Sequence, residues 1–293
     1  MVSSSLQQQL QPFISESLGV RISSMHFSSV GGGSINEAYE LIINKKDKFF
    51  CKINSADAFP QMFAKEKKGL ELLAAQGVIR VPQAFASIIL SDRQLLILEW
   101  IEQGIKSDRF WKLFGEQLAA LHAITANYCG LNEDNYMGAL PQSNEPSGDW
   151  VHFFIQQRLL PQIELATTKN LLDGQHQKKF ENLFKSLPSI FPDEKFSLVH
   201  GDLWSGNYLC NHSGQPVLID PAVYYGHRSM DLAMTTLFGG FDPGFYKTYH
   251  YHAPFPSNHQ QQWDICNLYP LLIHLNLFGA GYLRDINHII QYY

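Results

Sequence analysis

Hydrophobic positions in the first third of the chain follow a helical period once and then alternate repeatedly. Apolar residues recur every three or four positions from Leu6 to Leu18, which predicts a helix there. Alternation between turn-forming segments predicts strands at 27–30, 38–43, 48–54, 83–90 and 94–100. The segment therefore reads as an antiparallel sheet with helical cover.

A second helix, over residues 58–76, carries an acid on its hydrophobic stripe. The stripe runs from Phe59 to Leu73, and Glu66 lies on the same face. An unpaired carboxylate on an inward face costs several kcal/mol, so a cation is expected beside it. Lys52, on the preceding strand, is the best candidate, although a lone strand lysine is usually solvated. The pattern predicts a Lys52–Glu66 ion pair.

Beyond Ile101 the pattern becomes mostly helical. Helices are expected at 110–124, 150–165, 178–187 and 228–238, a final helical pair at 264–285, and a loop at 135–146. His122 is interpreted as a core histidine. His274 and Asn276 either line a substrate cleft or are satisfied core groups, with the second interpretation favoured. The chain is thus predicted to be α+β, with lobes at 1–100 and 101–293.

The densest candidate chemistry follows a short predicted strand at 196–199. Gly201 turns the chain so that Asp202 is presented at the strand's end, and Asn207 follows five residues later. Predicted strands at 208–210 and 216–219, joined by turn-forming residues, fold back as a hairpin that brings Asp220 near Asn207. Each acid alone is more often a turn or cap residue. Together, an amide and a carboxylate suit magnesium, and Asp202 can accept a hydroxyl proton.

The same residues resemble a known family. His200-Gly201-Asp202 with Asn207 is similar to the catalytic loop of phosphotransferases for aminoglycosides, choline and related small molecules. Residues 203–207, 219–228 and 231–234 resemble, more specifically, the fructosamine (ketosamine) kinase family. The resemblance implies a bilobal protein kinase-like fold. Its N-lobe has an antiparallel sheet and one key helix, and its helical C-lobe carries the catalytic-loop hairpin.

The resemblance also implies roles for individual residues. Asp202 would be the catalytic base, with magnesium held by Asn207 and Asp220. Apart from the resemblance, Trp204 lies two residues from Asp202 and offers a flat face, so we expect it to stack on the acceptor; its alternative role is packing under the loop. The remaining implied sites are the nucleotide-binding residues Gly31, Gly32, Gly33, Ser34, Lys52, Glu66, Glu99 and Ile101, and the loop supports His200 and Asp231. Taken alone, the glycines indicate only a flexible hairpin, Glu99 and Ile101 an ordinary strand end, and Asp231 a helix-turn acid.

Composition excludes several classes of protein. A net charge of −5 and a pI near 6.2, without a basic block, argue against nucleic acid as a partner. No segment has the length and apolarity of a membrane span, and residues 1–19 do not resemble a secretory signal. The four cysteines are too scattered for a zinc site or a disulfide framework. A reduced, cytoplasmic and monomeric protein is expected.

The predicted function is ATP- and Mg²⁺-dependent phosphorylation of a sugar hydroxyl on ketosamines, either small molecules or glycated proteins, which would contribute to deglycation. Two alternatives remain: a kinase for another small alcohol, such as choline or an aminoglycoside, and a nucleotide-binding scaffold without turnover. A protein kinase is disfavoured because Asp220-Pro221-Ala222 replaces Asp-Phe-Gly and no long activation segment follows.

Overall fold

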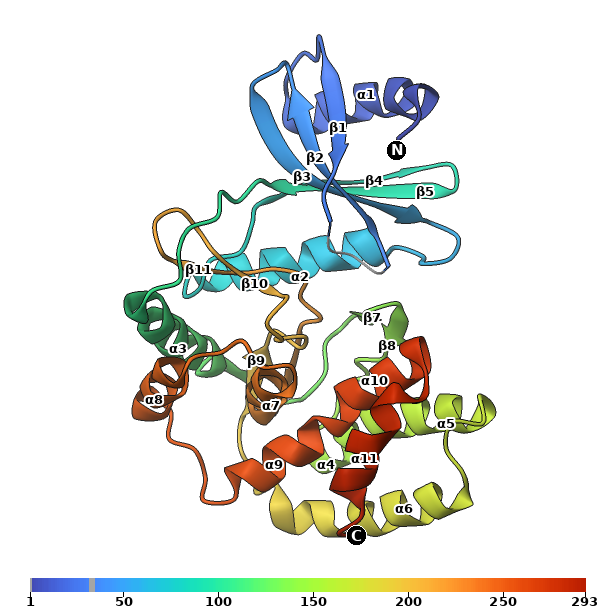
Figure 1. Cartoon of the computed structure of the whole chain (residues 1–293), viewed down its shortest axis with the longest axis vertical. Coiled ribbons are helices and arrows are strands. Elements are labelled where there is room, and N and C mark those ends of the chain that lie inside the picture. The colour runs from blue at the N-terminus through green and yellow to red at the C-terminus, as the bar shows by residue number, and fades with distance from the viewer. Residues whose placement is uncertain (1, 32–34) are drawn as a thin grey trace. The chain divides into compact units, whose positions relative to one another are not determined.

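The computed structural model describes residues 2–31 and 35–293, and confirms the α+β class. By its contacts the chain forms two compact units (Figure 1). The first comprises Met1–Lys106 and Leu209–Ile219, and the second Ser107–Tyr208 and Asp220–Tyr293. The division into domains after residue 100 stays a prediction.

The first unit contains a five-stranded antiparallel sheet in the order β1-β2-β3-β5-β4. The strands are β1 (Met25–Ser29), β2 (Glu37–Ile43), β3 (Asp47–Ser55), β4 (Ala84–Leu90) and β5 (Arg93–Glu99). Two helices pack on them, α1 (Ser4–Leu18) and α2 (Met62–Gln76). All five predicted strands and both predicted helices are present.

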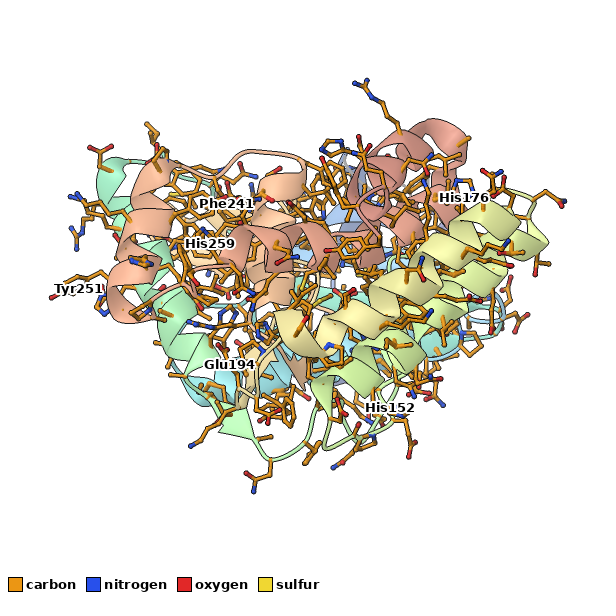
Figure 2. The ribbon with its side chains drawn as sticks, turned by 90° about the horizontal axis from the view of Figure 1, so that it is seen from below. His152, His176, Glu194, Phe241, Tyr251 and His259 are labelled. Carbon is orange, nitrogen blue, oxygen red and sulfur yellow. The ribbon has the colours of Figure 1, made fainter. Side chains whose placement is uncertain are left out.

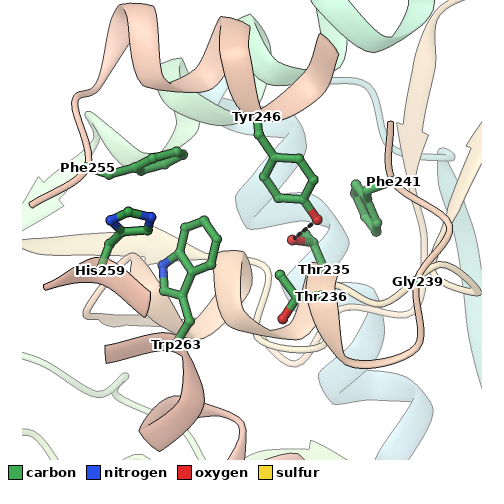
Figure 3. A pocket seen from close by; sticks show the side chains of 8 residues that line it. All are labelled: Thr235, Thr236, Gly239, Phe241, Tyr246, Phe255, His259 and Trp263. Atoms are coloured by element: carbon green, nitrogen blue, oxygen red, sulfur yellow. Dashed lines mark hydrogen bonds between the residues drawn. The ribbon is translucent and has the colours of Figure 1, made fainter. Parts of the chain in front are cut away.

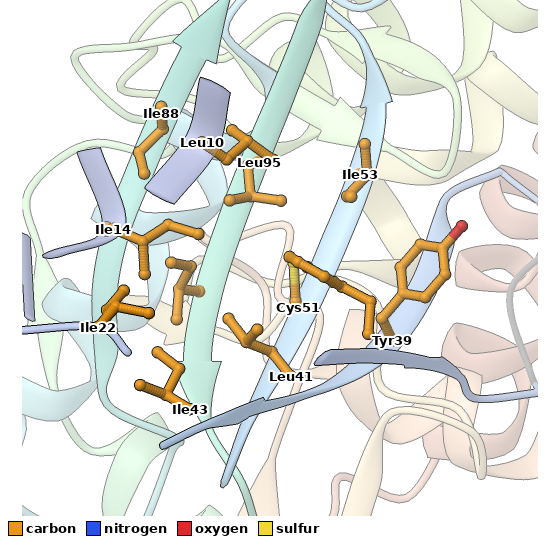
Figure 4. Close-up of a cluster of buried hydrophobic side chains, with 13 residues drawn as sticks. Leu10, Ile14, Ile22, Tyr39, Leu41, Ile43, Cys51, Ile53, Ile88 and Leu95 are labelled. Atoms are coloured by element: carbon orange, nitrogen blue, oxygen red, sulfur yellow. The ribbon is translucent and has the colours of Figure 1, made fainter. Parts of the chain in front are cut away.

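The hydrophobic core of this unit explains the direction in which Lys52 points. Leu10 and Ile14 of α1 pack with side chains from one face of the sheet, including Leu41 and Cys51 (Figure 4). Because side chains alternate along a strand, Lys52 of β3 lies on the opposite face from Cys51. That face is the one covered by α2.

A hairpin from later in the chain completes the first unit. Its strands are β10 (Tyr208–Cys210) and β11 (Pro216–Leu218), as predicted. The Asn211 side chain accepts hydrogen bonds from the N–H groups of Ser213 and Gln215, which closes the turn. Gly104 lies so close that a Cβ there would come within 2.2 Å of the Asn211 carbonyl oxygen. The hairpin is therefore fixed to the segment after β5.

The second unit is mainly helical. Its helices are α3 (Asp108–His122), α4 (Trp150–Phe153), the π-helix η1 (Phe154–Leu159), α5 (Leu160–Thr168), α6 (Gly174–Ile190), α7 (Ser229–Leu237), α8 (Pro243–His252), α9 (His259–Cys266), α10 (Leu268–Phe278), the 3-10 helix η2 (Ala280–Tyr282) and α11 (Leu283–Ile290). A small sheet has the order β12-β9-β6, from β6 (Thr125–Ala126), β9 (Phe196–Val199) and β12 (Tyr224–Gly226).

The segment 135–146, expected to be a loop, instead contains a hairpin. Its strands are β7 (Asn135–Met137) and β8 (Leu140–Gln142), paired antiparallel. The prediction was wrong because Asn135 and Gln142, which look like surface residues in the sequence, are buried and hydrogen-bonded to each other. Burial of amides is favourable only where their hydrogen bonds are satisfied, and the sequence does not show those partners.

Candidate active site

The predicted ion pair is present in the first unit. Lys52 Nζ lies 2.7 Å from Glu66 Oε1, and their side chains are 5% and 11% exposed. Strand alternation presents Lys52 to α2, and the helical stripe presents Glu66 to the sheet. This arrangement fixes a cation in a largely dry environment, where it can bind phosphate.

The other predicted nucleotide contacts of the first unit are partly described. Gly31 is an exposed bend, whereas Gly32, Gly33 and Ser34 lie outside the described residues. The backbone N–H of Glu99 donates to the Gln83 carbonyl oxygen at 2.8 Å, and the Glu99 carboxylate pairs with Arg80. Ile101 follows β5 in irregular structure and is half-buried. Their role with a nucleotide remains a prediction.

In the second unit, two loops lie against each other behind the candidate base. Gly201 has φ +84°, and a Cβ there would come within 2.1 Å of the Ala222 carbonyl oxygen, so only glycine fits. The Ala222 N–H donates to the His200 carbonyl oxygen at 2.9 Å. The segment after Asp220 is thus bonded to the segment before Asp202.

The donor set fits a hard cation. Asn207 Nδ2 donates to the main-chain oxygen and to Oδ2 of Asp202, both at 2.8 Å. Because the amide nitrogen is engaged, Oδ1 is the Asn207 atom that a cation would meet. Asp220 supplies a carboxylate from a left-handed backbone with φ 56°, an uncommon conformation that recurs at functional sites. An amide oxygen and a carboxylate match the ligand preference of Mg²⁺.

A buried carboxylate braces the catalytic loop. Asp231 of α7 accepts hydrogen bonds from the N–H groups of His200, at 2.7 Å, and Gly201, at 2.8 Å. His122 of α3 contacts Asp231 at 3.1 Å and the Tyr249 hydroxyl of α8 at 2.8 Å. Burial alone would raise the pKa of Asp231, but its hydrogen bonds and the nearby histidines keep that pKa below the usual value. Asp231 thus fixes the backbone of His200 and Gly201, and its support of a catalytic loop stays a prediction.

Two members of this network went unrecognised in the sequence. His122 was interpreted as a core histidine, and it is buried, but it also links α8 to the loop brace through Asp231. Tyr249 was not singled out. The only signal was the helical phase of His122, which places it on the buried face of α3.

Trp204 belongs to an aromatic surface on the second unit. Its side chain is 37% exposed and its ring meets Phe238 edge-on, with centroids 5.9 Å apart. Phe238 in turn contacts His274, which contacts Phe278 and Tyr282. Trp204 also packs over Gly206, where a Cβ would come within 2.3 Å of the indole. It therefore packs on the loop and still presents a face to solvent.

His274 and Asn276, treated together in the sequence, differ in the structure. His274 joins the aromatic surface described above, with its Nδ1 bonded to the Pro270 carbonyl oxygen at 2.7 Å. Asn276 is buried and donates Nδ2 to the main chain of Gln162 at 2.9 Å. Asn276 is a core group, whereas His274 is half-buried among aromatic side chains, and a place for it in a substrate cleft stays a prediction.

A separate, open surface pocket of ≈ 420 Å³ lies between α7, α8 and α9 (Figure 3). Tyr246, Phe255, His259 and Trp263 form its aromatic wall, and the Thr235 hydroxyl bonds to the Tyr246 hydroxyl at 3.0 Å. None of the predicted site residues that the structure describes lines it. Phe241 and His259 are also labelled among the side chains of Figure 2.

Other classes of site find little support. Among residues 2–31 and 35–293, no group of three or more His, Cys, Asp or Glu side chains could hold a metal. All four cysteines are buried and unpaired with one another. Within the same described ranges, no helix combines the length and the apolarity needed to cross a membrane.

Comparison with known proteins points to one family. The fructosamine kinase family model matches residues 6–293. A probable ketoamine kinase of Synechocystis sp. is 37% identical over 97% of this chain and 95% of its own length. The chloroplastic protein-ribulosamine 3-kinase of Arabidopsis thaliana is 35% identical over 90% of this chain and 81% of its own.

Solved structures confirm the kinase-like fold. A Haemophilus somnus protein assigned as a fructosamine-3-kinase superposes with a TM-score of 0.88 at 25% identity, covering 97% of this chain and 96% of that one. The aminoglycoside phosphotransferase APH(4)-Ia shares the fold with a TM-score of 0.62 at 14% identity, covering 96% and 98% of the two chains.

Proposed function

Because the chain belongs to the fructosamine kinase family, we propose that it transfers the terminal phosphoryl group of ATP to a sugar hydroxyl of ketosamines. The chain is a phosphotransferase of the kinase-like fold. The observation that carries the chemistry is the pairing of Asp202 with Asn207, beside the loop that presents Asp220.

Each charged residue has a distinct role in this proposal. Lys52, held by Glu66, binds the phosphates of ATP. Asn207 Oδ1 and the Asp220 carboxylate hold Mg²⁺, which when bound neutralises phosphate charge. Asp202 orients the acceptor hydroxyl and takes its proton, a task worth about 10²- to 10⁴-fold in rate. The Asn207 amide keeps the Asp202 carboxylate in one orientation.

The acceptor is proposed to lie on the aromatic surface that includes Trp204 and Phe238. A ketosamine combines a polar sugar with an amine that is protonated near neutral pH, and flat aromatic faces bind both sugars and ammonium groups. Small ketosamines and glycated lysines on proteins are both proposed acceptors. The free, buried cysteines suit a reducing compartment such as the cytoplasm.

The test is ADP formation with Mg²⁺ and a panel of acceptors: a fructosamine, a ribulosamine, a glycated protein, choline and an aminoglycoside. The proposal requires turnover with at least one ketosamine and a phosphorylated sugar in the product, identified by ³¹P NMR. Turnover only with choline or the aminoglycoside would retain the phosphotransferase and reject the acceptor. ATP binding without turnover on any acceptor would indicate a scaffold.

A further inference from the structure

A buried pair of amides grips the backbone just after Asp220. Asn135 of β7 donates Nδ2 to the Val223 carbonyl oxygen at 2.9 Å, and Gln142 of β8 donates Nε2 to the Ala222 carbonyl oxygen at 3.2 Å. Asn135 is 8% exposed and Gln142 1%. Two consecutive carbonyls are thus held within three residues of Asp220.

We propose that Asn135, Gln142 and Asn144, here called the amide clasp, are positioning residues that hold Asp220 in the geometry that binds magnesium. The inference rests on the proposed role of Asp220 as a metal ligand. It assigns a purpose to the hairpin β7–β8, whose strands are too short to form a stable sheet alone.

The clasp is internally connected. The Asn135 side-chain oxygen accepts from Gln142 Nε2 at 2.7 Å and from Asn144 Nδ2 at 3.1 Å. Asn144 Nδ2 also donates to the Glu133 carbonyl oxygen at 3.1 Å. Each amide therefore has a defined orientation, because reversing one would place two donors or two acceptors against each other. Connected, satisfied networks of this kind rigidify the backbone that they contact.

A buried cation anchors the clasp on one side. Arg158, at the end of the π-helix η1, is fully buried and donates Nη2 to the Asn144 side-chain oxygen at 2.7 Å. Its Nη1 donates to the Ser143 carbonyl oxygen. In the described part of the chain it makes no ion pair with a carboxylate; the rings of Phe153 and Tyr224 lie 4.6 and 4.1 Å from its guanidinium carbon.

Burying the charged guanidinium of Arg158 carries a desolvation cost that its contacts must offset. A buried guanidinium without a carboxylate depends entirely on hydrogen bonds and aromatic faces for compensation. A π-helix turn is itself a local departure from α-helical bonding that is often found near functional sites. The guanidinium itself reaches the clasp through its bond to the Asn144 side-chain oxygen.

Tyr269 of α10 holds the clasp from another side. Its hydroxyl donates to Gln142 Oε1 at 2.9 Å. Burial raises the pKa of Tyr269 to about 12, with Arg158 opposing this and the charge of Asp202 adding to it, so the hydroxyl stays protonated as a donor. The Tyr269 hydroxyl therefore remains a donor that fixes the side-chain oxygen of Gln142.

The backbone at Asp220 is a place where such support is needed. Asp220 has φ 56°, and uncommon conformations persist only where surrounding contacts determine them. The Ala222 N–H donates to the His200 carbonyl oxygen, and the Ala222 carbonyl oxygen accepts from Gln142 Nε2. Both backbone polar groups of Ala222 are therefore fixed. Loss of the clasp would let the Asp220 carboxylate leave its binding geometry.

The experiment compares Gln142→Met with Gln262→Met, a substitution of another fully buried glutamine, bonded instead to Ser229 and the Ile190 carbonyl. Mn²⁺ binding is measured by electron paramagnetic resonance in the presence of a non-hydrolysable ATP analogue. Amide hydrogen exchange of residues 220–224 is measured by mass spectrometry. Tyr269→Phe and its control Tyr246→Phe provide milder variants in case Gln142→Met does not fold.

Substitution of residues that orient metal ligands weakens metal affinity by about 10- to 100-fold. We expect Gln142→Met to weaken Mn²⁺ binding by about tenfold or more and to speed exchange at 220–224, with Tyr269→Phe giving a smaller change in the same direction. Neither control should do so. If Gln142→Met and Gln262→Met bind Mn²⁺ alike and exchange alike, the clasp is merely structural and the inference fails.

An Asp220→Asn arm separates this inference from the proposed function. If Asp220→Asn binds Mn²⁺ as well as the unchanged protein does, the proposed metal ligand is wrong. The role of the clasp in magnesium binding then fails with it. If instead Asp220→Asn loses Mn²⁺ binding but exchange at 220–224 is equal in Gln142→Met and Gln262→Met, the metal ligand stands and the clasp alone is overturned.

Discussion

Removing the charge of Glu66 should lower both the stability of the fold and the affinity for ATP, while helix α2 itself keeps its structure. Glu66→Gln preserves the side chain's size and removes the carboxylate that lies 2.7 Å from Lys52 Nζ. The ammonium would remain in a site where its side chain is only 5% exposed. We expect lower stability and a higher KM for ATP.

The magnitude follows from the geometry of the pair. At this separation and an effective dielectric constant of about 20, the Coulomb attraction is about 6 kcal/mol. Desolvation of both ions offsets part of it, and breaking buried pairs costs about 3–5 kcal/mol. Since Glu66 retains 11% exposure, the lower end applies, so Glu66→Gln should cost about 3 kcal/mol.

The same helix offers a matched control. Glu71 pairs with Lys67 one turn away, but their side chains are 55% and 27% exposed. Pairs of this kind contribute about 0.3–0.5 kcal/mol, so Glu71→Gln should barely shift the urea midpoint. Urea unfolding at constant m-value and the KM for ATP would be measured for both variants. Equal losses in the two would refute the assignment of Lys52–Glu66 as a buried, phosphate-positioning pair.

Three further predictions concern the second unit. Gly201→Ala would place a Cβ within 2.1 Å of the Ala222 carbonyl oxygen at φ +84°, so it should abolish turnover and lower the melting temperature. The control Gly214→Ala has a similar φ of +73° but open space around the added Cβ, so it should lower only stability. Burial, together with the charges of Arg228 and His122, lowers the pKa of His227 to about 3. The Glu194 carboxylate, 3.6 Å from His227 Nε2, acts in the opposite direction and does not cancel this shift. The unfolded chain therefore binds the extra proton below pH about 6.5, and stability should fall by up to about 1.4 kcal/mol per pH unit towards pH 3. Urea titrations at several pH values should show a shallower slope for His227→Gln; an identical slope would contradict this. Trp204→Ala should raise the KM of the acceptor more than that of ATP in steady-state kinetics, and equal increases would rule out stacking.

Much of the first unit could be predicted because its signals are local. Lys52 and Glu66 each lie on a face defined by the periodicity of their own element, and the two faces meet once α2 covers the sheet. The hairpin around Asn211 follows from its turn-forming residues. The association of that hairpin with the first unit was not foreseen, because it depends on contacts such as that of Val217 with Arg80, far apart in the sequence.

The missed parts of the site depend on partners that are distant in sequence. The hydrogen bonds from Asn135 and Gln142 to the segment after Asp220 join residues about eighty positions apart in the sequence. Hydrophobic periodicity does not indicate which amide side chains will be buried and bonded. His122 reaches Asp231 from α3, and Tyr249 of α8 bonds to His122. A single sequence shows which residues can make such bonds, but only the fold shows which ones do.

The most direct test of the account compares ketosamine-dependent ADP release by the unchanged protein and by Asp202→Asn, under saturating ATP and Mg²⁺. The account predicts turnover with a fructosamine or ribulosamine that falls by about 10²-fold or more in the variant, with the KM for ATP nearly unchanged. Full ketosamine turnover by Asp202→Asn would contradict the proposed base and the mechanism built on it.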